Sequence, residues 1–211
     1  MIRTLALIML ATPALAQAPV VPRFVAEDGA LPHSFTGEWE FMVGGGVATF
    51  DCSGDGLPEV FLSGGTAPAA LFLNESRADA LAFRKIDSGL EAEMVSGAYP
   101  LDVDADGIID LALLRVGESR LMRGLGDCRF EEASEAWGFE SFDAWTTAFA
   151  ATWEAGADWP TLAFGTYIDR REEAFPWGSC TPGRFYRGSA GRFDAPLELT
   201  PAHLGHGNCQ P

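Results

Sequence analysis

Basic residues are scarce in this 211-residue chain, which has 14 Lys and Arg against 30 Asp and Glu and a formal net charge of −16. This excess of negative charge would repel the phosphates of nucleic acids and the head groups of anionic membranes, so neither is expected as a partner. It suits a soluble protein and the uptake of divalent cations. Intrinsic disorder is not expected, because 47% hydrophobic and 11% aromatic residues supply enough material for a core.

Long apolar runs are also missing. The run Leu5–Leu10 is too short to span a membrane, and no later segment qualifies. It follows Arg3 and precedes the small-x-small sequence Ala14-Leu15-Ala16, which is the pattern of a secretory signal peptide over residues 1–16 with cleavage before Gln17. Cleavage removes one base and no acid and leaves a charge of −17. The mature chain is expected to be periplasmic or secreted.

Cysteine pairs of the C-x-x-C kind are absent, which argues against a zinc or redox centre. The four cysteines are Cys52, Cys128, Cys180 and Cys209. In an oxidising compartment they can form disulfides with three alternative connectivities. Cys180–Cys209 is the favoured pair, because both residues lie in the glycine- and proline-rich C-terminal region.

Catalytic signatures are missing as well. The glycine-rich stretches "SGGTAP" and "GGG" lack the lysine and helix of a phosphate loop, and no G-x-S-x-G motif occurs. The cluster His203-x-x-His206-x-x-Cys209 lacks a fourth ligand for a soft metal. Glu38 and Glu40 flank Trp39 as in some glycosidases, but tryptophan recurs throughout the chain, which favours a packing role. No catalytic residue is assigned.

Internal repetition dominates what the sequence does contain. The segment "FDCSGDGLPEVFLSGG" from Phe50 aligns with "LDVDADGIIDLALLRVG" from Leu101 at an offset of 51, and a further 51 residues lead to "TWEAGADWPTLAFG". A stretch of small residues precedes each acidic loop or its remnant. After the loop come an apolar run, a second strand-like stretch and a run that contains phenylalanine. Four short strands per unit of about fifty residues are typical of β-propeller blades. No segment shows sustained helical periodicity.

The expected fold is therefore all-β, a partial β-propeller of about three four-stranded blades. "RFVAEDGAL" from Arg23 is expected to form the last strand of a preceding or closing blade. Three blades do not close a ring, so the chain is expected to be part of a longer propeller or to self-associate through open edges. The expected divisions are a signal peptide (1–16), an N-terminal strand (17–45), two blades (46–95 and 96–145), a degenerate blade (146–200) and a tail (201–211).

The alternating acids in the first two units indicate a calcium site in each. Calcium takes about six to eight oxygens, which D-x-D-x-D-G spacing directs inward around a sharp turn. The loop does not end in the twelfth-position glutamate of an EF-hand, since Leu62 and Leu113 stand there. The expected ligands of the first loop are Asp51, Ser53, Asp55, the Leu57 carbonyl and Glu59, and those of the second are Asp102, Asp104, Asp106, the Ile108 carbonyl and Asp110.

Two further expectations follow from the acids. The first loop carries three acids against four in the second, so it should bind calcium more weakly. In the third unit the ligand positions hold Trp153, Ala155, Ala157 and Thr161, so no metal is expected there.

These loops resemble those of FG-GAP (VCBS) repeats, known from integrin α-chain propellers and many exported bacterial proteins. The segments "EFMVGGGVATFDCSGDG", "GAYPLDVDADG" and "GDCRFEEASEAWGF" make residues from Arg23 to about Phe193 similar to the N-terminal propeller part of bacterial proteins related to cartilage acidic protein. The resemblance implies a seven-bladed propeller, often followed by an ASPIC/UnbV-type segment, with calcium held between the first two strands of a blade. Neither the remaining blades nor that segment is present here.

The sequence thus predicts an exported calcium-binding propeller that acts as a non-catalytic binding or scaffold module for a protein or glycan partner. The alternative is a propeller-type polysaccharide hydrolase or lyase, which would need an acid/base pair outside the two loops.

Overall fold

The structure, a computed structural model, describes residues 21–27, 29–42, 45–167, 169 and 181–199. Within these residues the regular elements are β-strands and one three-residue 3-10 helix, η1 (Trp39–Phe41), which confirms the all-β prediction. No helix among them is long and apolar enough to cross a membrane. The signal sequence, Cys180, Cys209 and the histidines His203 and His206 lie outside the described residues.

The first repeat unit forms a four-stranded antiparallel sheet in chain order. Its strands are β1 (Val47–Phe50), β2 (Glu59–Leu62), β3 (Ala70–Asn74) and β4 (Phe83–Ile86). Because Phe50 pairs with Glu59, the first acidic loop is the connection between β1 and β2. Side chains alternate between the two faces as expected for strands, so that Ala48 and Phe50 of β1 are buried while Val47 is 62% exposed.

The second and third units are joined in one nine-stranded sheet. β6, with nine residues, pairs with β5 and β7 and also, at its far end, with β9, where Val116–Glu118 lie opposite Asp143–Trp145. The equivalent strand of the first unit, β2, has only four residues. The contact of the first unit with β5 that matches the β6–β9 pairing is therefore a single bridge between Gly65 and Val95. The strands of this sheet are β5 (Val95–Leu101), β6 (Asp110–Glu118), β7 (Arg120–Gly124), β8 (Phe130–Glu132), β9 (Asp143–Thr152), β10 (Thr161–Thr166), β11 (Gly183–Ser189), β12 (Arg192–Phe193) and β13 (Leu197–Leu199).

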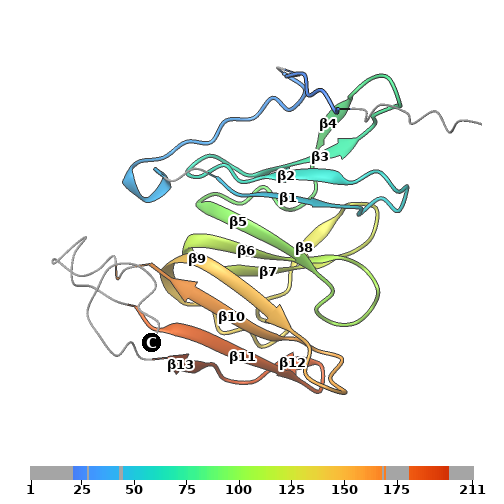
Figure 1. Ribbon diagram of the computed structural model, residues 1–211. Coiled ribbons are helices and arrows are strands. Elements are labelled where there is room, and N and C mark those ends of the chain that lie inside the picture. Colours follow the sequence, from blue (N-terminus) through green and yellow to red (C-terminus); the bar gives the residue numbers. More distant parts are fainter. Residues whose placement is uncertain (1–20, 28, 43–44, 168, 170–180, 200–211) are drawn as a thin grey trace, which may run out of the picture.

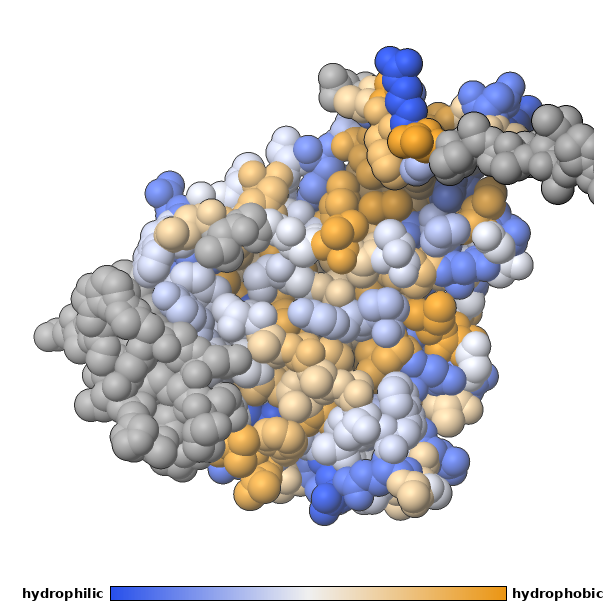
Figure 2. Space-filling model, viewed as in Figure 1, coloured by the Kyte–Doolittle hydropathy of each residue, from blue (hydrophilic) through white to orange (hydrophobic). Residues whose placement is uncertain are grey.

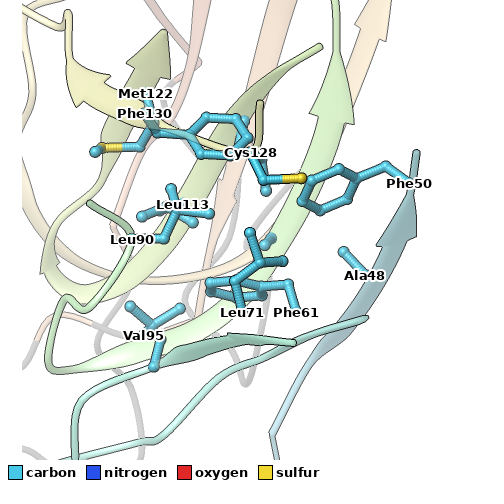
Figure 3. Close-up of a cluster of buried hydrophobic side chains, with 13 residues drawn as sticks. Ala48, Phe50, Phe61, Leu71, Leu90, Val95, Leu113, Met122, Cys128 and Phe130 are labelled. Carbon is cyan, nitrogen blue, oxygen red and sulfur yellow. The ribbon is translucent and has the colours of Figure 1, made fainter. Parts of the chain in front are cut away.

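The strands stack as three layers, with β1–β4, β5–β8 and β9–β13 following one another from top to bottom in Figure 1. One buried cluster contains Phe61 and Leu71 of the first layer together with Leu113 of the second (Figure 3). A second contains Leu121 of the second layer and Phe164 of the third. Burying each such side chain stabilises the fold by about 2 kcal/mol, so apolar contact between layers holds the stack together. On the outer face seen in Figure 2, apolar side chains lie among polar ones.

The N-terminal segment differs from the prediction. Residues 23–27 form no strand and pair with no strand among the described residues, and Phe24 is 92% exposed. The chain instead runs across the first layer, where Thr36 bridges to Gly65 in parallel. The strands also cross the expected unit boundaries, since Val95 already belongs to β5 and β9 begins at Asp143.

Candidate metal centre

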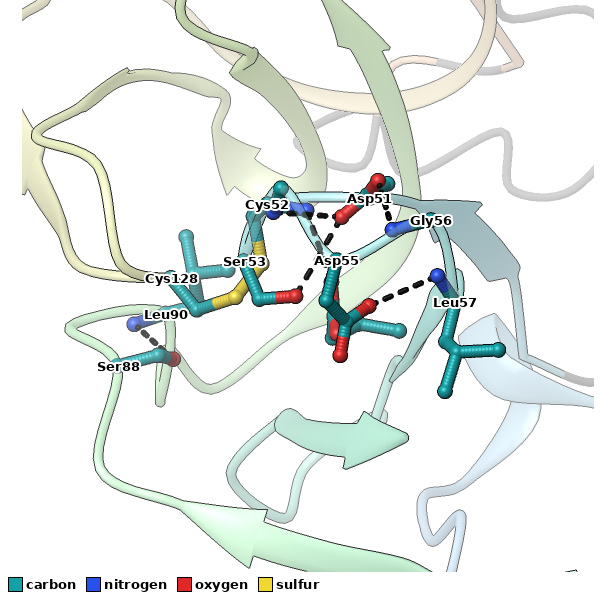
Figure 4. Close-up of a disulfide and its surroundings, with 11 residues drawn as sticks. Asp51, Cys52, Ser53, Asp55, Gly56, Leu57, Ser88, Leu90 and Cys128 are labelled. Atoms are coloured by element: carbon teal, nitrogen blue, oxygen red, sulfur yellow. Dashed lines mark hydrogen bonds between the residues drawn. A yellow bond between two sulfur atoms is a disulfide. The ribbon is translucent and has the colours of Figure 1, made fainter. Parts of the chain in front are cut away.

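The first acidic loop is folded around the carboxylate of Asp51. Its Oδ1 accepts a hydrogen bond from the Gly54 N–H (2.7 Å) and its Oδ2 accepts one from the Gly56 N–H (2.8 Å). Gly54 and Gly56 have φ values of 77° and 83°, which glycine adopts at little cost. The bond from Gly56 helps to hold the pKa of Asp51 below its ordinary value. Figure 4 shows this loop with the disulfide beside it.

Glu59, at the start of β2, is the buried acid of the first loop. It is 0% exposed, and its Oε2 accepts a hydrogen bond from the Cys52 N–H at 2.8 Å. Its Oε1 is buried and has no hydrogen-bond partner. Carboxylate oxygens of Asp51, Asp55 and Glu59 lie within 4.8 Å of one another. A buried carboxylate oxygen without a donor is costly unless a cation compensates it.

The second loop, between β5 and β6, repeats the same backbone conformation. Asp102 Oδ2 accepts from the Gly107 N–H (3.0 Å), as Asp51 does from Gly56. Asp106 Oδ1 accepts from the Ile108 N–H (2.8 Å), as Asp55 does from Leu57 (2.8 Å). The match arises because equal spacing of aspartate and glycine specifies the same turn twice.

The carboxylate cluster of the second loop consists of three aspartates and does not include the acid at the ninth position. Oxygens of Asp102, Asp104 and Asp106 lie within 4.8 Å of one another, and the Oδ1 atoms of Asp102 and Asp104 are buried without a partner. The Asp104 side chain is only 10% exposed. Desolvation, followed by the charge of Asp106, raises its pKa.

Asp110 occupies the place equivalent to Glu59 but has both oxygens bonded. Oδ2 accepts from the Val103 N–H and Oδ1 from the Gly124 N–H, each at 2.8 Å. Desolvation raises the pKa of this wholly buried carboxyl to about 6. Asp110 therefore joins the second loop to the end of β7, in addition to its predicted role as a ligand.

A basic residue that the motif did not indicate faces the second loop. Arg123 of β7 places Nη2 3.0 Å from Asp104 Oδ2 and 3.4 Å from Asp106 Oδ2. Only the register between β6 and β7 brings this side chain to the loop, so nothing in the loop sequence could have revealed it.

The third loop lacks the acidic set. One of its two acids, Glu154, is instead engaged in an ion pair, in which Oε1 lies 2.8 Å from Arg187 Nε and accepts from Thr161 Oγ1 at 3.0 Å. Trp153 is 46% exposed. No group of metal-binding side chains occurs at this loop within the described residues.

The structure also forms a disulfide between Cys52 and Cys128, which the sequence left as the remaining pair if Cys180 bonds Cys209. It brings both sulfurs close to Glu59, but bonded sulfurs are not free to bind a metal. Of the other predicted ligands, Ser53 donates its Oγ–H to Asp51 Oδ1 at 3.4 Å. The N–H groups of Leu57 and Ile108 support the aspartates described above.

The donor sets fit a hard cation. Each loop offers three clustered carboxylates, and oxygen is the ligand that calcium and magnesium prefer. The unpartnered buried oxygens of Glu59, Asp102 and Asp104 are the atoms that such an ion would compensate. Asp51, Asp55 and Glu59 would hold it in the first loop, and Asp102, Asp104 and Asp106 in the second.

The sequence matches no protein-family profile and no curated protein.

Proposed function

We propose that this protein is an exported calcium-binding β-propeller module of the FG-GAP/VCBS kind, which binds or scaffolds a partner and performs no catalysis. The proposed blades are the three stacked layers, and calcium would sit in the first two loops. The excess of acidic residues and the Cys52–Cys128 disulfide are consistent with an exported, calcium-rich environment.

The observation that carries the proposal is the burial of carboxylate oxygens without donors in both loops. If these acids served only to form a turn, their oxygens would accept hydrogen bonds from backbone N–H groups, as those of Asp110 do. Glu59 Oε1 and Asp104 Oδ1 accept no hydrogen bond and lie close to other carboxylates. Such an arrangement is stabilised by a cation, whose structural role would be to hold the loop.

A binding role is favoured over polysaccharide cleavage by the surroundings of the one carboxylate pair considered for catalysis. Glu38 and Glu40 flank Trp39, whose ring packs edge-to-face on Trp145 at 5.6 Å between centroids. This tryptophan is part of a packed cluster with Phe41 and Val116. Its contacts favour a role in the core over one in stacking a sugar.

Thermal melting and calorimetric titration with calcium chloride test the proposal. The parent chain should bind two calcium ions, and its melting temperature should rise on moving from chelator to excess calcium. Glu59→Gln keeps an oxygen for the Cys52 N–H and removes the charge, so it should remove one of the two sites. Asp104→Asn with Asp106→Asn should remove the other.

Asp158→Asn is the matched control, because it removes one negative charge from the third loop, where no acidic cluster lies among the described residues. It should leave the stoichiometry at two. A parent chain that takes up no calcium, or whose two loop variants bind as it does, would show that the acids are only turn residues.

A further inference from the structure

We infer that Arg123 is an internal counter-ion of the second loop, which makes that loop the weaker of the two calcium sites. The inference rests on the proposed function and concerns how this chain's own residues divide the binding between its loops. It reverses the order that acid count alone predicts.

The two loops differ most in the cation that faces them. The guanidinium of Arg123 contacts both Asp104 and Asp106, at 3.0 and 3.4 Å. Among the described residues, no ion pair joins a basic side chain to an acid of the first loop. The second loop therefore contains part of its own neutralising charge, and the first loop does not.

The register of the strands shows which residue replaces the arginine in the first unit. Leu111 pairs with Met122, and Val60, 51 residues before Leu111, pairs with Phe72. The next residue along each third strand is Arg123 in one unit and Leu73 in the other. Leu73 packs against the apolar cluster between the first two layers. The same place in the repeat is therefore basic beside the second loop and apolar beside the first.

A calcium ion in the second loop must compete with this guanidinium. It would share the carboxylates of Asp104 and Asp106 with a like charge a few ångströms away, or it would displace Arg123 into solvent. The Arg123 side chain is 41% exposed and can move into solvent, but this movement breaks both of its ion pairs. In either case calcium binds the second loop more weakly than it would without Arg123.

The buried acid at the ninth position adds to the difference. Glu59 Oε1 is uncommitted, whereas both oxygens of Asp110 already accept from backbone N–H groups. The fourth acid of the second loop therefore contributes less free acceptor capacity than the acid count suggests. At this ninth position the first loop keeps a free carboxylate oxygen, and the second loop has none.

Calcium titrations of variants that keep one loop each test the inference. The variant Asp104→Asn with Asp106→Asn keeps only the first loop as an intact calcium site, and Glu59→Gln keeps only the second. We expect the first loop to have the lower Kd. Adding Arg123→Leu to the Glu59→Gln chain installs the residue type found in the first unit, and should tighten the second loop about tenfold.

Arg120→Leu is the matched control in the same Glu59→Gln background. Arg120 lies on the same strand and pairs with Glu132 at 3.3 Å, so its loss changes net charge equally and should leave the Kd unchanged. Binding at the second loop that is as tight as at the first, or that Arg123→Leu does not strengthen, would overturn the inference alone. Failure of all these chains to bind calcium would instead overturn the proposed function.

Discussion

Buried polar side chains of this protein differ in how many of their oxygens have a hydrogen-bond partner. Glu59 and Asp110 occupy equivalent places in the repeat and are both wholly buried. The shorter Asp110 accepts two backbone hydrogen bonds, while the longer Glu59 accepts one and leaves an oxygen free. Tyr186 is a third case, because its ring is fully buried and its hydroxyl donates to the Glu140 carbonyl at 2.6 Å.

Tyr186 should make the protein lose stability in alkaline solution. Desolvation raises the pKa of its phenol to about 12, above the ordinary value of 10.0. The unfolded chain then gives up this proton first, so the free energy of unfolding should fall as pH rises from about 10 to 12, by up to roughly 3 kcal/mol. Below pH 10 the phenol is neutral in both states and contributes no pH dependence. Urea unfolding at pH 8 and pH 11.5 measures the fall.

Tyr186→Phe should show a smaller fall over the same interval, although loss of the hydrogen bond lowers its stability at pH 8. Tyr99→Phe serves as control, because Tyr99 is 38% exposed. The expectation fails if the parent and Tyr186→Phe lose equal stability between the two pH values.

Among elements, the loop between β1 and β2 and the turn between β7 and β8 are connected covalently. Cys52 lies between two predicted ligands of the first loop, and Cys128 lies in the turn of the second layer. The Cys128 N–H also donates to the Cys52 carbonyl at 3.3 Å. The disulfide, which spans 76 residues of sequence, therefore ties the first acidic loop to the neighbouring layer.

Replacing both cysteines, Cys52→Ala with Cys128→Ala, should lower the free energy of unfolding by about 2–4 kcal/mol. The bond restricts the unfolded chain across a long loop, so its loss mainly increases the entropy of the unfolded state. Guanidinium unfolding of the parent and the variant measures the difference. An unchanged midpoint and slope would mean that the two segments are held equally well by their non-covalent contacts.

At the scale of the whole molecule, η1 of the N-terminal segment packs against β6 and β9. Phe41 of η1 packs in one cluster with Val116 of β6 and Trp145 of β9. These residues lie far apart in sequence, and Trp39 adds an edge-to-face contact to Trp145. The helix η1 before β1 is therefore part of the core and contacts both the second layer and the third.

Phe41→Ala should destabilise the protein by about 3–5 kcal/mol, because Phe41 is 5% exposed and truncation leaves a cavity beside Trp145. Tryptophan fluorescence during urea unfolding measures the loss, and the folded-state emission should move to longer wavelength as water reaches the cluster. Phe24→Ala is the matched control, since Phe24 is 92% exposed and should change neither quantity. Similar behaviour of the two variants would show that Phe41 is not part of the core.

Much of the architecture follows from short-range pattern. Short apolar runs after the loops predicted the strands around Phe61, Leu113 and Leu162, and each of these residues lies in a strand. The spacing of Asp51 and Asp102 from their glycines also predicted two loops of one kind. Both features depend on interactions within about ten residues, where backbone geometry and side-chain hydrogen bonds act directly.

Stacking and register decided the rest. The Cys52–Cys128 pairing needs the first layer to lie against the turn of the second, and Arg123 reaches Asp104 only through the pairing of β6 with β7. The joining of β6 to β9 and the folding of Phe41 into the core likewise bring distant segments together. Such contacts depend on how buried faces fit against one another, which no local run of residues specifies.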